Sequence, residues 1–490
     1  RLLIWNIMKR KYWMFGVAAV VLLSGCRASR VEQSPAADVK LPSAYDTTSS
    51  TDTAIDTMSM AMLSWDSFFT DTLLQHCIGE ALANNHSFQQ TLERVSIARA
   101  QLRQSRSQLF PSVSAGVQGY VQRFGDYTMD GVGNETTNTP DLAKDRHIPA
   151  PYREFQLGVS FQWEADVWGK LTQKKRAAAA RWYSSMEAAR LARTLLVSEV
   201  AMLYYELVGL DRQAEVLEHA LAEARRSHDL TFELKQEGEE TQLAVDQFHA
   251  RVLQLQGMLL ETKQLTEEKE RALCTLMGRF PAPVKRCAFD SIEQLRFPSQ
   301  IGIPAQLLQL RPDIREAEME LIAAKADVKA ARKAFYPSLI LGGSGGFNAF
   351  NLSKWFVSPA SLVYDLGLGI TAPIFNRAEI RSVWQASQSR ERIALSAYHE
   401  AALKAYEEVS NLIVASDLTA RRKQLKQEEC MVNRRSVSNA TEMFKLSFVG
   451  YLEVLSADER YLECELEQIA LSTEYCALQA LLYRALGGGA

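Results

Sequence analysis

Three stretches of the chain alternate apolar residues with polar or small ones at a period of two, a pattern typical of strands with one apolar face. The clearest runs from Phe155 to Trp163, where every second residue is large and apolar. Each run is about the 9–11 residues that a tilted strand needs to cross a membrane, which predicts lipid-facing barrel strands. A soluble antiparallel sheet with one buried face would show the same period. With a strand-like run after Pro337, the expected strands are 112–124, 152–165, 338–350 and 360–372.

Long segments without proline follow these strands. Residues 171–236 hold one glycine and residues 378–447 hold none, so each predicts a single helix of roughly 100 Å at about 1.5 Å per residue. The returning segments 241–277 and 305–336 are shorter, and end to end they match one long helix. The expected bounds of the main helices are 169–237, 240–277, 377–447 and 451–486.

The two halves of the chain resemble each other. Residues 98–113 match residues 324–339 at a constant offset of 226, and both copies lead from an alanine-rich helical segment through a proline into a strand. The residues around Gly238 match those around Gly450 at an offset of 212. The expected organisation is therefore a first repeat at 64–277, an equatorial connection with four prolines at 278–304, a second repeat at 305–486 and a tail at 487–490.

The N-terminal segment has the features of a lipoprotein signal peptide. Basic residues after Met8 precede an apolar run, and Leu23-Ser24-Gly25-Cys26 matches the lipobox. Removal of residues 1–25 would leave Cys26 with diacylglyceryl and N-acyl lipid, and residues 26–63 as a tether rich in Ser, Thr and Asp. Arg27 in place of Asp favours the outer membrane. Because the removed segment carries four basic residues and no acid, the net charge falls from −3 to −7, which argues against a nucleic-acid partner.

Four strands per chain are too few to close a membrane barrel. An open strand edge in lipid leaves backbone groups unpaired at roughly several kcal/mol each, so other copies of the chain have to complete the barrel. Two copies give eight strands, whose bore is filled by side chains, whereas three copies give twelve strands with room for a lumen. The trimer is therefore the smallest assembly that forms a conduit.

Several motifs resemble those of the TolC-like outer-membrane efflux protein family. Residues 65–85 resemble its opening, and Leu310-Arg311-Pro312-Asp313-Ile314, with the alanine-rich segment that follows, resembles a motif of its second half. Residues 161–169 and 372–376 resemble its two strand-to-helix corners, and residues 450–460 resemble its periplasmic tip. The resemblance covers about residues 63–486. Together with the lipobox, it indicates the lipoprotein branch that serves RND-type tripartite efflux pumps.

The resemblance implies an α+β membrane protein, a homotrimer whose twelve-stranded outer-membrane β-barrel continues into a long periplasmic α-helical barrel. It implies a passive pore that is not an enzyme and has no cofactor beyond the lipid on Cys26. The implied partners are a periplasmic adaptor (membrane fusion) protein, an inner-membrane RND-type transporter and outer-membrane lipid, and the cargo is drugs or other small toxic compounds. A type I protein-secretion duct, a heavy-metal cation channel and a purely structural lipoprotein of coiled coils are the alternatives.

Candidate functional residues lie at the two expected helical reversals. The family narrows its periplasmic end with acidic rings after the tip glycine, and Glu453 occupies the first of those positions. Ser456 occupies the second, where the family usually has Asp. A ring of Glu453 carboxylates would favour cations, unless the side chain faces solvent outside the helical barrel. Glu239 and Glu240 are weaker gate candidates, and the expected adaptor-docking residues are Gly238, Glu239, Val449, Gly450 and Tyr451.

Two further patterns are weaker indications of chemistry. The segment Gly342-Gly343-Ser344-Gly345-Gly346 satisfies the GxSxG pattern of hydrolases, but glycines on a barrel wall explain it better because no strand-turn-helix context surrounds it. Met58, Met60 and Met62 offer thioethers that suit Cu(I), although methionines in a tether are more often incidental. We therefore expect neither a catalytic nor a metal site.

The remaining cysteines do not have the spacing of a disulfide framework or a zinc site. Only Cys274 and Cys287 lie close enough in sequence to flank one short connection that a disulfide could close. Asp313, after Pro312, is expected to cap the start of a helix. A seven-residue repeat predicts a coiled-coil seam formed by Leu455, Leu462, Ile469 and Cys476.

Overall fold

The computed structural model describes residues 42, 45, 60–295, 297, 302–374, 377–446 and 448–488. Every described residue lies in one unit of the chain, Val39–Ala490. The expected signal peptide, the lipidation site Cys26 and nearly all of the tether lie outside the described residues. In the part of the chain that is described, no helix is long and apolar enough to span a membrane.

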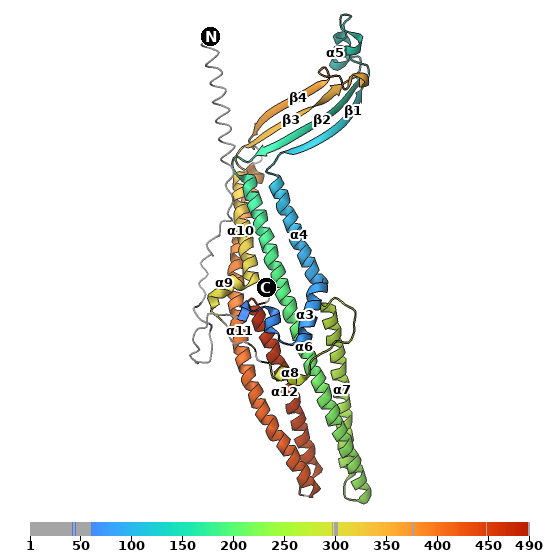
Figure 1. Cartoon of the computed structure of the whole chain (residues 1–490), viewed down its shortest axis with the longest axis vertical. Coiled ribbons are helices and arrows are strands. Elements are labelled where there is room, and N and C mark those ends of the chain that lie inside the picture. Colours follow the sequence, from blue (N-terminus) through green and yellow to red (C-terminus); the bar gives the residue numbers. More distant parts are fainter. Residues whose placement is uncertain are drawn as a thin grey trace. The chain divides into compact units, whose positions relative to one another are not determined.

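Four antiparallel strands form one sheet in the order β1-β2-β3-β4 (Figure 1). Each strand pairs with its neighbour in sequence, so β1 and β4 form the two edges. Strand β4 begins two residues later than expected, because Ser361 and Leu362 donate backbone hydrogen bonds to Val357 and Pro359 in the preceding turn (2.8 and 3.1 Å). The observed bounds are β1 Ser112–Gln122, β2 Tyr152–Ala165, β3 Ser338–Ala349 and β4 Leu362–Thr371.

The strand register gives the sheet one apolar and one polar face. One row across all four strands joins Val117, Leu157, Phe347 and Leu362. The adjacent row joins Gln118, Gln156 and Asn348. Because side chains alternate between the two faces along every strand, adjacent rows lie on opposite faces. The period-two pattern of each separate strand therefore adds up to one continuous apolar surface.

Ser344, the serine of the GxSxG segment, lies within β3 on the polar face. Its hydroxyl donates a hydrogen bond to the Asp365 carboxylate on the paired strand β4. The flanking glycines allow β2 and β3 to approach closely, because a Cβ on Gly346 would lie 2.1 Å from the Leu157 carbonyl oxygen. The segment is therefore part of a sheet and not a turn that exposes a nucleophile.

Two long helical hairpins follow the strands. Helix α6 pairs with α7, and helix α11 pairs with α12, while α6 also contacts α4, α10 and α12 (Figure 1). The principal helices are α3 Thr72–Asn84, α4 His86–Ser107, α6 Lys170–Glu237, α7 Gln242–Leu276, α10 Pro312–Lys333, α11 Arg377–Lys445 and α12 Tyr451–Ala485. Short elements are α2 Trp65–Phe68, α5 Met129–Thr137, α8 Phe289–Glu293, α9 Leu307–Leu310, and the 3-10 helices η1 Met60–Met62, η2 Lys144–Arg146, η3 Pro304–Gln306 and η4 Leu352–Lys354.

The expected single helix over 305–336 is interrupted. Arg311 adopts an extended conformation (φ −74°, ψ 122°) because the following Pro312 disfavours helical backbone at the residue before it. Helix α10 therefore begins at Pro312, and Asp313 does not cap it as expected. Instead, Asp313 pairs with the buried Arg311 side chain (2.6 Å), which also reaches Glu408 of α11 at 2.8 Å. The motif thus fastens the start of α10 to the second hairpin.

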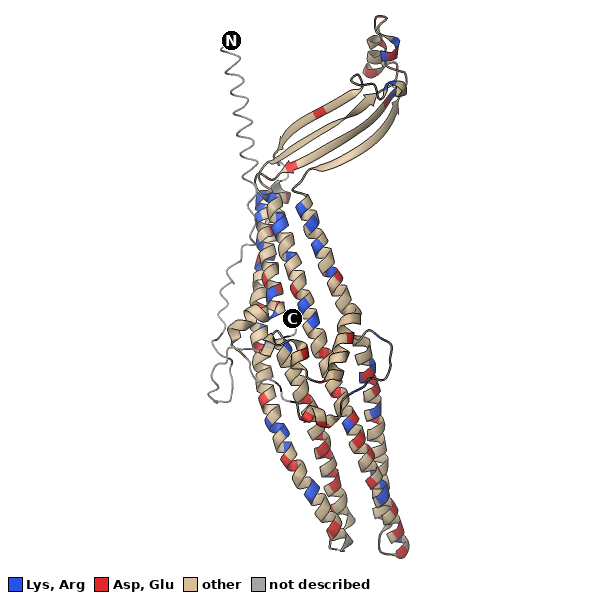
Figure 2. Cartoon of the chain, viewed as in Figure 1, with Lys and Arg blue, Asp and Glu red and all other residues tan. Residues whose placement is uncertain are grey.

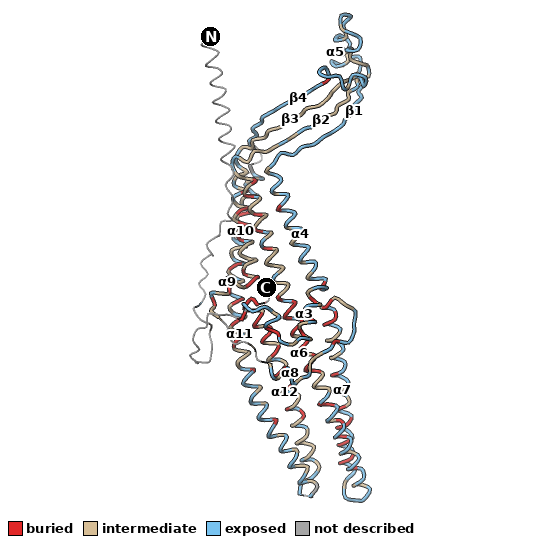
Figure 3. Tube along the Cα trace, viewed as in Figure 1, coloured by how far each residue is buried: buried red, intermediate tan, exposed pale blue. Residues whose placement is uncertain are grey.

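The most buried side chains gather where α3, the middle of α6 and the C-terminal half of α12 meet (Figure 3). Tyr204 of α6 is fully buried, and its hydroxyl donates to Asp71 Oδ2 at 2.6 Å while accepting from the Cys287 amide at 2.9 Å. Arg286, which like Cys287 belongs to the equatorial connection, pairs with Asp211 and Glu270 at 2.7 and 2.8 Å. These contacts hold the equatorial connection against the first hairpin.

The seven-residue repeat of α12 contributes to the core between the hairpins. Leu462 and Ile469 are buried against apolar residues of α6 and α7, including Leu217 and Leu255. Cys476 is also buried, whereas Leu455, nearest the turn, is only half-buried. Because these positions recur on one side of the helix, the repeat forms a packing seam toward α6.

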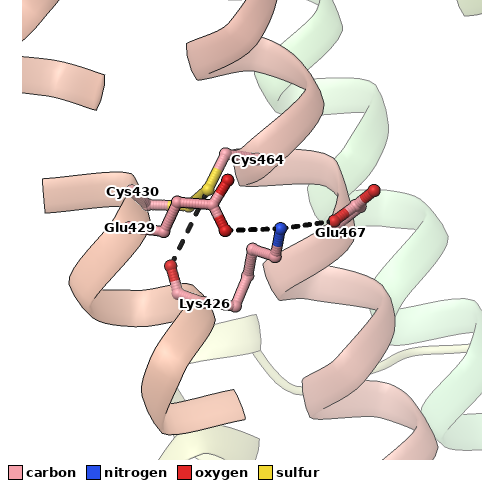
Figure 4. The surroundings of a disulfide bond; sticks show 5 residues. All are labelled: Lys426, Glu429, Cys430, Cys464 and Glu467. Carbon is pink, nitrogen blue, oxygen red and sulfur yellow. Dashed lines mark hydrogen bonds and ion pairs between the residues drawn. A yellow bond between two sulfur atoms is a disulfide. The ribbon is translucent and has the colours of Figure 1, made fainter. Parts of the chain in front are cut away.

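The disulfide considered between Cys274 and Cys287 is not formed, and both of these cysteines are free. A disulfide instead joins Cys430 of α11 to Cys464 of α12 (Figure 4). Beside it, the Lys426 ammonium lies 2.7 Å from Glu429 and 2.7 Å from Glu467 (Figure 4). The second hairpin is therefore held together by a covalent bond and an adjacent ion pair between its two helices.

Candidate functional site

The turn between α6 and α7 requires a glycine. Gly238 has a left-handed backbone (φ +81°), and its N–H donates to the Lys235 carbonyl at 3.0 Å. The Glu239 N–H donates to the Leu234 carbonyl at 3.0 Å, which completes a Schellman motif. Thr241 then caps α7 by accepting from the Ala244 N–H. Gly238 and Glu239 are both exposed, so both are accessible to a protein that binds at this end of the hairpin.

The turn between α11 and α12 is built differently. The Phe448 N–H donates to the Met443 carbonyl at 2.9 Å, and α12 begins at Tyr451. Gly450 is extended (φ −84°, ψ 172°), a conformation open to any residue, so only the first turn requires a glycine. Ser447, two residues before Val449, lies outside the described residues. Val449 and Tyr451 are half-buried and Gly450 is exposed.

The candidate gate residues lie on the first two turns of α12. Glu453 is exposed, and its carboxylate lies near Gly450, because a Cβ on that glycine would be 3.2 Å from Glu453 Oε2. A carboxylate in the first helical turn also interacts favourably with the helix dipole. Ser456 is half-buried one turn further along. The two residues therefore share one end of α12, with only Glu453 presenting a charge.

A contact between the two hairpins lies close to these turns. Arg251 of α7 is only 6% exposed, and its guanidinium lies 3.5 Å from Glu459 and 3.9 Å from Asp458 of α12. One turn nearer the ends, the rings of Phe248 and Tyr451 are 6.3 Å apart. Burial raises the pKa of the Asp458 carboxyl, and Arg251 partly offsets this rise. The contact links the hairpin that carries Gly238 to the one that carries Glu453.

The sequence interpretation did not identify Arg251, although a signal for it was present. The buried stripe of α7 runs through Val245, Phe248, Val252 and Leu255, and Arg251 lies in the same stripe. A charged residue at such a position has to find a partner on a neighbouring helix or pay a desolvation cost. Its partner Asp458 belongs to the repeated segment around the second turn.

The polar face of the sheet is the second candidate surface. Glutamines, serines and glycines predominate there, with Glu154, Glu164 and Asp365 as charged members. Glu154 accepts a hydrogen bond from Asn348 at 2.7 Å across paired strands, and Ser114 and Ser160 are hydrogen bonded at 2.8 Å. Polar groups with this spacing can line a water-filled passage while the apolar face contacts lipid.

Comparison with known proteins shows the family to which the chain belongs. A sequence model of the family described as "Outer membrane efflux protein" matches residues 77–279 and 303–488. Outer membrane protein OprJ of Pseudomonas aeruginosa is 30% identical over 497 residues, covering 97% of this chain and 96% of that protein. Pyoverdine export outer membrane protein OpmQ of Pseudomonas putida is 29% identical over 436 residues, covering 87% of this chain and 88% of that protein.

The fold also matches a solved structure. A membrane protein from Pseudomonas aeruginosa superposes with a TM-score of 0.78 at 27% identity, covering 91% of this chain and all of that one. The match includes both the sheet and the helical hairpins, because it spans nearly the whole described part of this chain.

Proposed function

Because the chain belongs to the outer membrane efflux protein family, we propose that three copies form one conduit for an efflux pump. The chain is an outer-membrane protein that spans the periplasm with its helices, and it is not an enzyme. In the proposed trimer, four strands from each copy close a twelve-stranded barrel, and the hairpins continue it as a helical barrel. The Cys26 lipid anchors each copy to the same membrane.

The two-faced sheet with open edges is the observation that carries this proposal. All residues of β1 and β4 are exposed, including Val117 at 70% and Leu366 at 74%. The bare apolar face is unfavourable in water and favourable in lipid, whereas the unpaired backbone groups of the two edges are costly in lipid unless other copies pair with them. Large apolar side chains on α7 and α11 are exposed as well, among them Leu260, Leu403 and Leu425. A ring of identical copies would cover edges and helices together.

Two adjacent residues of β1 test the membrane placement of the sheet. Val117 lies on the apolar face and Gln118 on the polar face, and both are exposed. Val117→Lys should destabilise the membrane-inserted state by about 2–4 kcal/mol, the range for lysine facing lipid at the bilayer midplane, and so abolish insertion. Gln118→Lys should insert normally, because its side chain meets water in the lumen. Equal insertion of the two variants in an outer-membrane fractionation assay would contradict the proposal.

The proposed cargo is drugs or other small toxic compounds, delivered by an inner-membrane RND-type transporter through a periplasmic adaptor. Family membership and the polar, weakly acidic lining of the sheet support a conduit for small solutes. Cells that lack the chain should become sensitive to the compounds it exports, so a panel of antibiotics, organic solvents and metal salts identifies the class. Sensitivity to metal salts alone would favour the cation channel, and loss of a secreted protein would favour the secretion duct.

The proposed gate is a ring of Glu453 side chains at the ends of the hairpins, with Ser456 on the next turn. Three carboxylates near the axis would attract cations and impede anions. Glu453→Gln should therefore lower the cation selectivity of single-channel currents. Glu463→Gln provides the control, because Glu463 is exposed on the same helix but lies almost three turns further from the end. Equal selectivity in both variants would place Glu453 outside the lumen.

The proposed adaptor-docking surface comprises Gly238, Glu239, Val449, Gly450 and Tyr451. Exposed apolar side chains next to them support docking, since Phe448 and Leu452 are 74% and 58% exposed. Replacing both with serine should abolish resistance to exported compounds while leaving the assembled mass and conductance unchanged. Retained resistance would place the adaptor elsewhere.

A further inference from the structure

Basic residues concentrate where the helices meet the sheet. Figure 2 shows Lys and Arg at the helix ends next to the strands. Lys170, Lys174, Lys175 and Arg176 open α6, which carries no acid before Glu187. Arg332 and Lys333 close α10, four residues before β3 begins. We call these six basic residues the basic collar.

The connections between helices and strands place the basic collar close to the membrane boundary. Only residues 166–169 separate β2 from α6, and only residues 334–337 separate α10 from β3. Four residues span at most about 14 Å, so the collar lies within reach of lipid headgroups when the sheet is in a bilayer. Long Lys and Arg side chains extend that reach.

Aromatic residues lie at the same boundary. The rings of Trp168 and Tyr336 are stacked 5.2 Å apart, and both side chains are nearly half exposed. Trp168 Nε1 donates to the Pro337 carbonyl at 2.7 Å, directly before β3. Tryptophan and tyrosine are enriched at the headgroup level of membranes because one end of each ring is apolar and the other polar. The aromatic residues thus mark the same level as the basic collar.

A pocket of about 400 Å³ opens at this level between the end of α10 and the start of α11. Among the described residues, its walls are Phe335, Pro373, Ile380 and Trp384, with Arg381 as the charged member. Trp384 Nε1 is buried without a hydrogen-bond partner, and Arg381 has no ion-pair partner among the described residues. The pocket therefore combines apolar walls with the buried Trp384 Nε1 and the exposed Arg381 guanidinium, neither of which has a partner in the part of the chain that the structure describes.

We propose that this pocket binds the headgroup of an anionic phospholipid. The Arg381 guanidinium and Trp384 Nε1 donate hydrogen bonds to the phosphate, while Phe335 and Ile380 contact the glycerol and the first methylenes of an acyl chain. Pro373 lies three residues after Ile370, which is 74% exposed on the apolar face of β4, so an acyl chain can pass from the pocket onto that face. This inference rests on the proposed function, because it requires the sheet to lie in the bilayer.

The charge of the site selects anionic over zwitterionic lipid. A bidentate arginine–phosphate contact is charge-assisted and geometrically specific. Lys170 of the collar is already paired with Glu164 at 2.5 Å. Each other Lys or Arg of the collar near the site adds attraction to an anionic surface, roughly fivefold in affinity per charge at moderate salt. Because this attraction is screened, the preference should decrease at high ionic strength.

Native mass spectrometry of the full-length protein, released from detergent micelles, tests the site. The probes are dioleoylphosphatidylglycerol, dioleoylphosphatidylcholine with the same chains, and water-soluble glycerol 3-phosphate. The wild-type protein should retain phosphatidylglycerol about tenfold better than phosphatidylcholine and should not retain glycerol 3-phosphate. Arg381→Gln should lower phosphatidylglycerol retention about tenfold, and Trp384→Phe should lower it by a smaller factor.

The matched control is Arg390→Gln, which removes an exposed arginine of the same helix two and a half turns further from the sheet and should leave retention unchanged. Equal retention of the two lipids, or unchanged retention in Arg381→Gln, would overturn the inference. The inference would also be overturned if Arg381→Gln lowered the mass of the assembly but left lipid retention unchanged. That result would indicate that a second copy of the chain, and not a lipid, occupies the pocket.

Conductance of the same samples separates this inference from the proposed function. A conducting assembly without lipid preference overturns only the lipid site. A monomer that still binds phosphatidylglycerol through Arg381 supports the site and overturns the conduit.

Discussion

Replacing Arg251 with Met should loosen the contact between the two hairpins near their turns. Methionine keeps the apolar packing of the side-chain stem but removes the ion pairs to Asp458 and Glu459, which lie 3.9 and 3.5 Å from the guanidinium. Both carboxylates are more than a third exposed, so solvent screening limits each pair to about 0.2–1 kcal/mol. We therefore expect local opening of the first turns of α12 to become easier by about 1 kcal/mol, or roughly fivefold.

The effect of Arg251→Met should depend on pH in a defined direction. Burial raises the pKa of Asp458 in the folded protein, and removing Arg251 raises it further. Below about pH 4 the carboxyl is protonated in both the folded and the opened state, so its ionisation affects neither. As pH rises through the folded-state pKa, the opened state, which has the lower pKa, is favoured. The loss of stability should therefore be larger at pH 7 than at pH 4.

Hydrogen exchange of the backbone amides in residues 451–470 measures this opening, with wild type and variant compared at each pH. Arg271→Met is the matched control, because Arg271 pairs with Glu267 on the same helix α7 and does not link the hairpins. Unchanged exchange in Arg251→Met, or an equal change in Arg271→Met, would refute the role assigned to Arg251.

Three further predictions concern the fold that supports the site. Gly238→Ala should destabilise the first turn by about 1 kcal/mol because its backbone is left-handed, whereas Gly450→Ala should cost much less; thermal dissociation of the assembled protein compares them. Tyr204→Phe removes two hydrogen bonds from a fully buried hydroxyl, one of them to a carboxylate, and should lower stability by about 2–4 kcal/mol, measured by circular dichroism on heating. Peptide mapping without reductant should recover Cys430 and Cys464 in one linked fragment, and separate fragments would contradict the disulfide.

The strands and long helices could be read from the sequence because their signals are local. The period of two from Phe155 to Trp163 survives in the structure as one face of β2, and the absence of proline from 171–236 allows the uninterrupted helix α6. The break at Arg311 is equally local, since a residue before proline avoids helical backbone, and the helix start expected at Asp313 already pointed to it.

Features that depend on how separate helices align could not be predicted from local sequence patterns. Cys430 and Cys464 lie 34 residues apart on different helices, and only the alignment of α11 with α12 brings them together. The pairing of Arg251 with α12 depends likewise on contact between hairpins that are distant in sequence. At the candidate site, the two turns and the position of Glu453 just after the second one could be predicted from the sequence, whereas the role of Glu453 as a gate stays a prediction. The sequence did not show that only Gly238 needs a left-handed conformation.

Single-channel recording of the purified, lipidated protein in planar bilayers, with its mass determined in detergent, tests the conduit most directly. We expect a mass of about three chains and small cation-selective currents that increase in Glu453→Ala. A monomer, or an assembly that never conducts, would contradict the conduit and favour a structural lipoprotein that spans the periplasm.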